Sequence, residues 1–222
     1  MKIDIYFRNA LVVFIIMIFM SAGMHAQKSM REVWVTMPDS VIPYLNQKLR
    51  AELIDYWDMK AEAKVKNILG GNTKLEELND KYMAVKLNGN TDVSFRLLNT
   101  ADTSYIICMV KTISAPAKES TVSLYSSDWQ PLNGEYGLSM GHNADDIKSS
   151  FIMPRDTMAV EQYNKLCAMV EPVMVAVELN KDEDSITFSL STPFITKKEK
   201  EELFIVLRQR KLKWDGKTFK EC

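Results

Sequence analysis

The fold class of this chain follows from a predicted β-hairpin at residues 82–97, with the sequence YMAVKLNGNTDVSFRL. Apolar and polar residues alternate on both sides of the turn NGN at 88–90, and this pattern indicates two strands that each bury one face. The next run, 104–112, is apolar on both faces, as is typical of a covered central strand. A shorter strand is expected at 121–125, so this region predicts an antiparallel four-stranded meander.

The same pattern returns in the second half of the chain. Residues 84–88 (AVKLN) correspond to 176–180 (AVELN), and residues 93–97 (VSFRL) correspond to 186–190 (ITFSL). A long internal repeat indicates a duplicated structural unit, although two half-buried hairpins could also look alike by pattern alone. We interpret the chain as two tandem units, each a helix followed by an antiparallel four-stranded meander.

Amphipathic helices are expected in front of both meanders. The first spans about 40–60, and its apolar stripe recurs at every fourth residue: Val41, Leu45, Leu49, Leu53 and Trp57. The second helix is expected at 157–170, and residues 74–80 predict one more short helix. Strands at 203–210 and 211–219 would complete the second meander.

A helix must bury its apolar stripe against a sheet, which gives an α+β fold with the helices packed on one face of the sheet. The opposite face of the sheet would then be open and concave. The expected organisation is a signal peptide at 1–26, a first α+β unit at 27–132, a glycine-containing linker or loop at 133–156, and a second α+β unit at 157–222.

The first 26 residues have the composition of a secretory signal peptide. Lys2 and Arg8 precede an unbroken apolar run at 10–20, and small residues then lead to an expected cleavage after Ala26. This run is shorter than the roughly 20 residues that a membrane-spanning helix needs. We therefore expect an exported protein, periplasmic or at the cell surface or secreted, with no membrane span after cleavage; an uncleaved membrane anchor is the alternative.

The composition of the 222-residue chain excludes several classes of protein. With 46% hydrophobic and 26% charged residues, it is not mainly disordered, collagenous or coiled-coil. A net charge of −1 gives no electrostatic reason to bind nucleic acid. Only His142 would remain after cleavage, which excludes mechanisms that need two histidines. Cys108, Cys167 and Cys222 could form one disulfide with one thiol left over, or all stay unpaired.

No cofactor, metal site or catalytic motif is predicted. The cluster GHNADD at 141–146 lacks the closely spaced nitrogen and sulfur ligands of a structural zinc site, and the acids at 182–184 lack the EF-hand pattern. The candidates for partner binding are aromatic and arginine side chains near predicted strand ends, which are residue types enriched at interface hot spots: Tyr125, Trp129, Arg208, Arg210 and Trp214.

Several short segments carry a resemblance to a known family: MPDS at 37–40, PYL at 43–45, LGG at 69–71, SLY at 123–125 and DWQPL at 128–132. On these residues the chain resembles a family of exported proteins of unknown function from Bacteroidales-type bacteria. The resemblance covers most of the mature chain and implies a periplasmic, surface or secreted location, with no particular activity. The predicted order of elements is also similar to β-lactamase-inhibitor-protein-like folds and PepSY-like modules.

The favoured function is a non-enzymatic binding module that presents its concave sheet to a protein or a cell-envelope partner. Two alternatives stay open: a carboxylate-dependent hydrolase acting on glycan or peptide, and a small-ligand carrier with a pocket between helix and sheet. Two facing buried acids in a cleft would favour the hydrolase. An apolar pocket would favour the carrier, and a broad aromatic face would favour the binding module.

Overall fold

The computed structural model describes residues 28–222 except 103, 142 and 193–194, so the expected signal peptide and His142 lie outside the described residues. The predicted α+β class with antiparallel sheets is confirmed. The helices of the described part are α2 (Met30–Thr36), α3 (Gln47–Asp58), α4 (Ala144–Phe151), α5 (Val160–Ala168) and α6 (Lys197–Phe204). None of these helices is both long and apolar enough to cross a membrane.

The first sheet is an antiparallel meander whose neighbours follow chain order. Its strands are β1 (Lys64–Lys66), β2 (Asn72–Leu78), β3 (Tyr82–Asn88), β4 (Thr91–Asn99), β5 (Tyr105–Ser114) and β6 (Lys118–Ser126). It has six strands instead of the expected four, because β1 and β2 extend it. The short helix predicted at 74–80 is wrong: this segment belongs mostly to β2, which pairs with β3 and buries Thr73 and Leu75.

The second sheet has four antiparallel strands, in the order β10-β9-β8-β7. They are β7 (Met174–Leu179), β8 (Ser185–Ser191), β9 (Arg210–Trp214) and β10 (Phe219–Glu221). The strand expected at 203–210 is wrong in position, because α6 occupies its first part. A capping box at Thr196 and Glu199 starts that helix: the Thr196 main chain donates to the Glu199 carboxylate, and the Glu199 main chain donates back to the Thr196 hydroxyl.

The helix expected at 40–60 is shorter than predicted and begins at Gln47, with Asn46 as its cap. The segment before it instead wraps around the buried guanidinium of Arg50. Arg50 donates to the main-chain oxygens of Trp34 (3.1 Å), Leu45 (2.6 Å) and Met37, and to the Asp39 carboxylate (2.8 Å). The bonds to Trp34 and Met37 satisfy carbonyls at the end of α2, and together the four bonds tie α2 and the segment after it to α3.

The first sheet lies in the middle of three layers. On one face, α2 and α3 pack against side chains such as Phe95 and Ile107 to form the first core. On the other face, Cys108 and Val110 pack against the second sheet in a second core. The expectation of an open concave face is therefore corrected: β7 and its neighbours cover the β4–β6 half of that face, and only the half towards β2 and β3 stays open.

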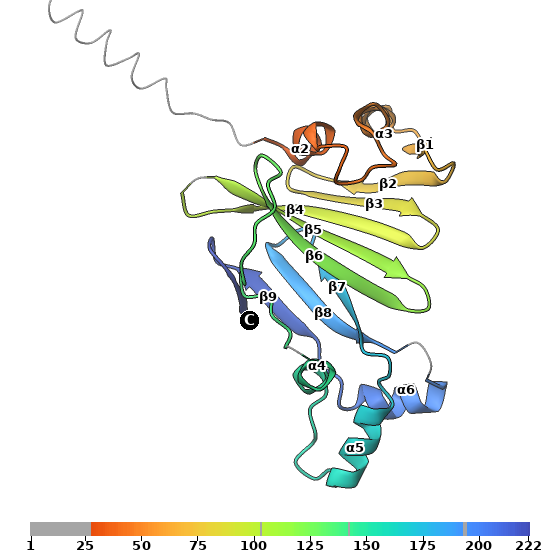
Figure 1. The fold of residues 1–222 in the computed structure, drawn as a ribbon, viewed down its shortest axis with the longest axis vertical. Coiled ribbons are helices and arrows are strands. Elements are labelled where there is room, and N and C mark those ends of the chain that lie inside the picture. The colour runs from red at the N-terminus through yellow and green to blue at the C-terminus, as the bar shows by residue number, and fades with distance from the viewer. Residues whose placement is uncertain (1–27, 103, 142, 193–194) are drawn as a thin grey trace, which may run out of the picture.

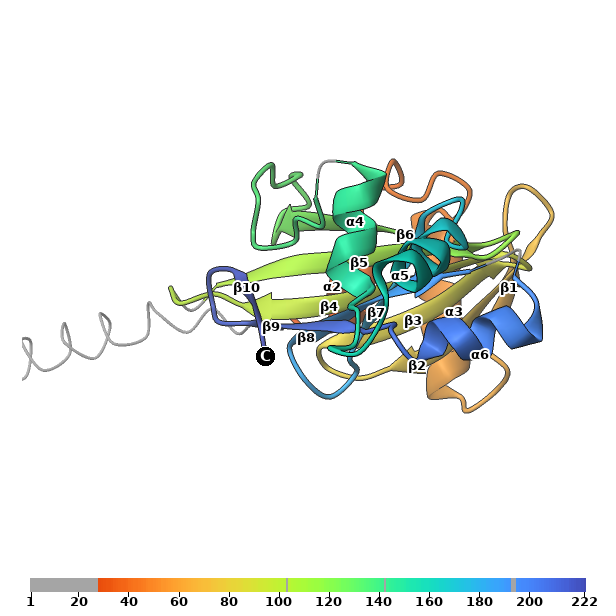
Figure 2. The same ribbon diagram turned by 90° about the horizontal axis from the view of Figure 1, so that it is seen from below.

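The remaining helices lie at the opposite end of the molecule from α2 and α3 (Figure 1). The segment 133–156, expected as a linker, contains α4, whose Phe151 enters the second core. Figure 2 shows α5 and α6 close to each other beside the second sheet. Around them lies a small third core made of Ile152, Leu166, Val170, Leu203 and Val206.

All three cysteines are free thiols, so of the two alternatives left open by the sequence, one disulfide or none, the structure has none. Cys108 is buried in the second core, Cys167 is half-buried on α5 and Cys222 is exposed. Complete burial raises the pKa of the Cys108 thiol to about 12.

Candidate functional site

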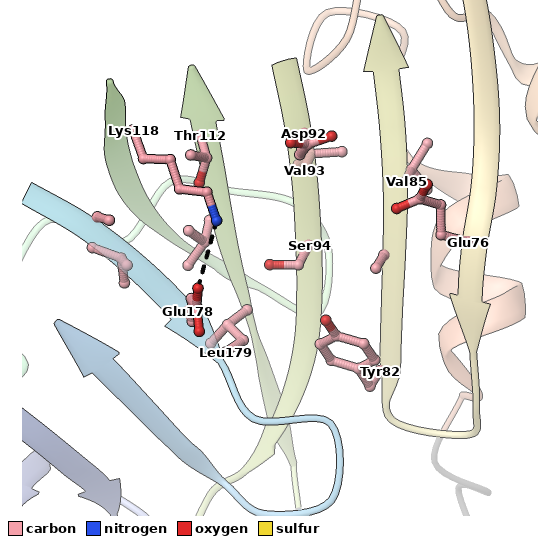
Figure 3. A pocket seen from close by; sticks show the side chains of 14 residues that line it. Glu76, Tyr82, Val85, Asp92, Val93, Ser94, Thr112, Lys118, Glu178 and Leu179 are labelled. Atoms are coloured by element: carbon pink, nitrogen blue, oxygen red, sulfur yellow. Dashed lines mark ion pairs between the residues drawn. The ribbon is translucent and has the colours of Figure 1, made fainter. Parts of the chain in front are cut away.

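The most site-like feature of the described residues is a groove between the open half of the first sheet and strand β7 (Figure 3). Its volume is about 240 Å³. The floor comes from β2 to β5, and one wall comes from residues 176–179 of β7. Below we call it the acidic groove, because three of its lining side chains are carboxylates: Glu76, Asp92 and Glu178.

The alternation of the predicted hairpin places the polar side chains in the acidic groove. On β4, Val93 and Phe95 point into the first core, so Asp92 and Ser94 point to the opposite face of the sheet. The same alternation brings Tyr82 from β3 and Thr112 from β5 to this face. Figure 3 shows these side chains on one side of the sheet, facing Glu178 and Leu179 of β7.

A β-bulge sets the position of Glu76. The register of β2 against β3 shifts between Leu75 and Glu77, so Glu76 is the extra residue of the bulge. A bulge redirects the side chain of the strand that carries it. Glu76 consequently faces the groove as an exposed carboxylate on its outer side.

A buried arginine links the two sheets beside Tyr82, one of the lining residues of the acidic groove. Arg96 of β4 is 3% exposed, and its Nε lies 2.7 Å from Oδ1 of Asp184, in the turn between β7 and β8. Its Nη1 donates to the main-chain oxygen of Asn180 over 2.9 Å. These bonds join the β7–β8 turn to the first sheet next to Tyr82.

Carboxylates outnumber cations among the described residues that line the groove. Lys118 is the one cation among the lining residues, and its Nζ lies 3.8 Å from Oε1 of Glu178. Burial is the main cause that raises the pKa of Tyr82, and the charges of Glu77 and Glu178 raise it further, against a smaller opposite effect of Arg96. Tyr82 thus stays a neutral hydroxyl that can donate a hydrogen bond at neutral pH.

This arrangement can hold a cationic group. Carboxylates accept hydrogen bonds from ammonium and guanidinium groups, and the hydroxyls of Tyr82, Ser94 and Thr112 offer further acceptors. Among the described residues, no group of three or more histidine, cysteine or acidic side chains is placed to hold a metal ion. The chemistry that the lining residues offer is recognition of positive charge.

Two of the predicted partner-binding residues belong to the first core. Trp129 is 7% exposed, and its ring packs edge-on against Phe95 with centroids 6.1 Å apart. Tyr125 is half-buried beside it, at 5.4 Å between centroids. Trp129 therefore presents almost no surface to a partner.

The other three belong to segments that pack on the opposite face of the first sheet. Trp214 is 6% exposed in the second core, and its Nε1 donates to the main-chain oxygen of Asn99 over 2.6 Å. Arg210 pairs with Glu221 at 2.6 Å, and Arg208 is exposed. The structure does not bring the five predicted residues onto one face, because the two tryptophans sit in different cores.

Sequence reasoning did not single out the residues of the acidic groove. The signal that was available is the polar face of the hairpin, which includes Asp92 and Ser94. The sequence carries no signal for the wall across the groove, because β7 reaches this face only through tertiary packing. The residues in contact are far apart in the chain, as the 57-residue separation of Ser120 and Val177 and the 88-residue separation of Arg96 and Asp184 illustrate.

Comparison with known proteins adds two findings. Residues 21–219 match the model of a family described as "Protein of unknown function (DUF3256)". The chain is also similar in fold to a domain of an uncharacterized protein from Porphyromonas gingivalis W83, with a TM-score of 0.71, 20% sequence identity, and coverage of 89% of this chain and 99% of that one. No curated protein matches the sequence.

Proposed function

This chain belongs to the DUF3256 family of proteins of unknown function, and we propose that it is a non-enzymatic binding module whose acidic groove holds a cationic side chain of a protein or cell-envelope partner. We also propose that it acts after export, as the signal-like first 26 residues and the resemblance to exported Bacteroidales-type proteins suggest.

The observation that carries this proposal is the excess of negative charge in the groove. Glu76, Asp92 and Glu178 face the same space, and Lys118, which pairs with Glu178, is the one cation among the described residues that line it. The carboxylates already face the same groove in the unbound protein, and the ion pair of Arg96 with Asp184 supports the position of the β7 wall. A pre-formed site of this kind avoids part of the ordering cost of binding.

The same geometry favours binding over the two alternatives. The general acid of a carboxylate hydrolase is kept protonated by a desolvated, apolar site, whereas Glu76 and Glu178 are exposed and Glu178 faces a lysine. A carrier of small apolar ligands needs an apolar pocket, whereas the space between α2, α3 and the sheet is filled by the side chains of the first core.

The proposal is tested with a charge-removing variant of the groove. The expected mature chain, residues 27–222, and its E76Q/D92N/E178Q variant serve as baits for crosslinking in envelope extract of the source cells. We expect a partner that is captured by wild type, competed by untagged protein and lost with the variant. A fluorescent hexalysine peptide gives a direct probe: its anisotropy should rise with wild type, and the effect should weaken with salt.

A second variant controls for loss of charge elsewhere. E161Q/E201Q/E202Q removes the same number of carboxylates from α5 and α6, away from the groove. It should keep both the partner and the hexalysine signal. Capture that survives in the groove variant, or that disappears equally in both variants, would contradict a specific role of the acidic groove.

A further inference from the structure

A second groove lies on the other side of the contact between β6 and β7, and it is built differently from the acidic groove. Its volume is about 560 Å³. One wall is β6 from Ser120 to Tyr125, the other is β7 at Val175 and Val177, and the rim is the loop at 131–140. Below we call it the edge groove, because β6 and β7 are the last strands of their sheets.

The outer edge of β6 is only partly paired. The Leu132 main chain donates to the Leu124 oxygen over 2.9 Å, and Ser126 donates to the Gln130 oxygen over 2.9 Å. Even-numbered residues of β6 therefore point their main-chain groups outward, since these groups alternate between the two edges of a strand. Val122 follows the same alternation, and none of the hydrogen bonds found between described residues joins its main chain to β7 or to the loop.

The outer edge of β7 faces the same space. The Val177 main chain donates to the hydroxyl of Ser120 over 3.0 Å, so Val177 points outward from its sheet. The Asn180 main chain donates to the Ser185 oxygen across the hairpin. The even-numbered residues of β7 therefore direct their main-chain N–H and C=O groups towards β8. Val175, two residues earlier, then also directs its main-chain N–H and C=O towards the groove. The edges of β6 and β7 meet at the contact of Ser120 with Val177, and the groove lies to one side of it.

None of the described side chains that line the edge groove carries a charge. Hydroxyls come from the β6 wall, and the apolar groups include half-buried side chains that a ligand could cover: Val122, Leu132, Leu138, Met140 and Val175. The floor is closed by Leu124, Val177 and Phe188, which are at most 7% exposed. A charged ligand would lose hydration here without finding a counter-charge.

We propose that the edge groove binds an extended, uncharged segment of a partner polypeptide, which adds as a strand to the edge of β6 at Val122. The outward N–H and C=O groups of a strand edge form a repeating row of donors and acceptors, and a polypeptide main chain matches it. The uncharged lining selects residues such as valine and threonine at alternate positions. This site is separate from the acidic groove and does not depend on it.

The test removes one main-chain donor without touching the sheet. In Val122→Pro the ring replaces an N–H that points out of the sheet, so the pairing with β5 stays intact. Val122→Thr keeps the N–H and the shape of the side chain, and it is the matched control. The probe is a labelled library of octapeptides in which alternate positions hold valine, threonine, serine or leucine. The peptides have blocked ends and a neutral polyethylene glycol tag for solubility, because lysines would also bind the acidic groove.

We expect library members that bind wild type and Val122→Thr within threefold of each other, and at least tenfold weaker binding to Val122→Pro. N-methylation of the peptide bonds that face β6 should remove binding while leaving the peptide side chains unchanged. The proposal is overturned if no member binds wild type above the N-methylated controls, if Val122→Pro binds equally well, or if sedimentation shows that the edge is occupied by a second copy of the chain.

Discussion

Arg96 of β4 and Asp184 of the β7–β8 turn form an ion pair with 2.7 Å between Nε and Oδ1, although 88 residues separate them in the chain. The guanidinium is almost completely buried, whereas the carboxylate is 28% exposed. Together with the bond from Arg96 to the Asn180 oxygen, this pair is a polar link between the two sheets.

Replacing Arg96 by methionine should lower the free energy of unfolding by about 2–3 kcal/mol, since it leaves a partly buried carboxylate and the Asn180 carbonyl without their donor. Urea unfolding measures this change. Arg31→Gln is the control: its pair with Asp58 is exposed on both sides, so the loss should stay below about 1 kcal/mol. Equal losses in the two variants would contradict a special role of the buried pair.

Arg50→Lys should destabilise the protein by about 3 kcal/mol. An ammonium group lacks the planar fork that reaches the oxygens of Trp34, Leu45 and Met37, so at least one buried carbonyl would lose its donor. Arg155→Lys on the exposed surface should change the stability by no more than about 0.5 kcal/mol. Chemical unfolding of both variants tests whether the shape of the guanidinium matters at position 50.

Trp214→Phe should lower the stability by about 2 kcal/mol, because the second core loses ring volume and the part-buried hydrogen bond from the indole N–H to the Asn99 oxygen is lost. For a protein of this length, that corresponds to a decrease in Tm of roughly 4–8 °C. Phe204→Leu, which changes a side chain that is 78% exposed, is the control and should leave Tm nearly constant. A Trp214 variant with unchanged Tm would instead point back to the partner-facing role expected from the sequence.

The pH dependence of stability should show the contribution of Asp215. Its bond with Lys220, and then the main-chain N–H groups of Thr218 and Lys217, lower its pKa to about 2. Because the folded pKa lies below the unfolded value of about 3.9, this stabilisation is complete above pH 4 and is lost as the pH falls towards 2. The stability difference between wild type and Asp215→Asn should therefore be constant from pH 5 to 8 and shrink between pH 4 and 2. Lys220→Met removes the main cause of the low pKa of Asp215, so the stability contribution of this carboxylate should be lost at a higher pH than in wild type.

Thiol titration should separate the three cysteines. Exposed Cys222 should react with an aromatic disulfide reagent within seconds to minutes in the native protein, and half-buried Cys167 more slowly. Cys108 should react only after unfolding, since burial raises its thiol pKa to about 12. Cys222→Ser should remove the fast phase, and fewer than three thiols in denaturant would indicate a disulfide that contradicts the structure.

The antiparallel hairpins were predictable because their signals are local. The turn at 88–90 and the alternation around it belong to a few consecutive residues, and the same holds for the hairpin of β7 and β8. Strand β2 was missed because its sequence NTKLEEL has the residue types of a helix. Pairing with β3 overrides that propensity, and pairing is a property of the sheet and not of the segment.

The candidate site was less predictable than the fold. Trp129 and Trp214 lie near strand ends, where an indole can face a partner or a core, and the choice depends on what packs across from it. The acidic groove poses the same difficulty, since Glu178 meets Lys118 only when the second sheet lies over the first. Sequence patterns indicate which side of a strand is polar, but they do not indicate which distant strand covers that side.

The small third core has a consequence for how the molecule opens. It holds far fewer side chains than the other two cores, and its helices carry exposed apolar residues such as Val160 and Phe204. Local unfolding of α5 and α6 should thus require much less free energy than separation of the sheets. Amide hydrogen exchange should be fast in α5 and α6 and slow in the two sheets. The walls of both grooves are strands of these sheets, so they should stay folded when α5 and α6 unfold locally.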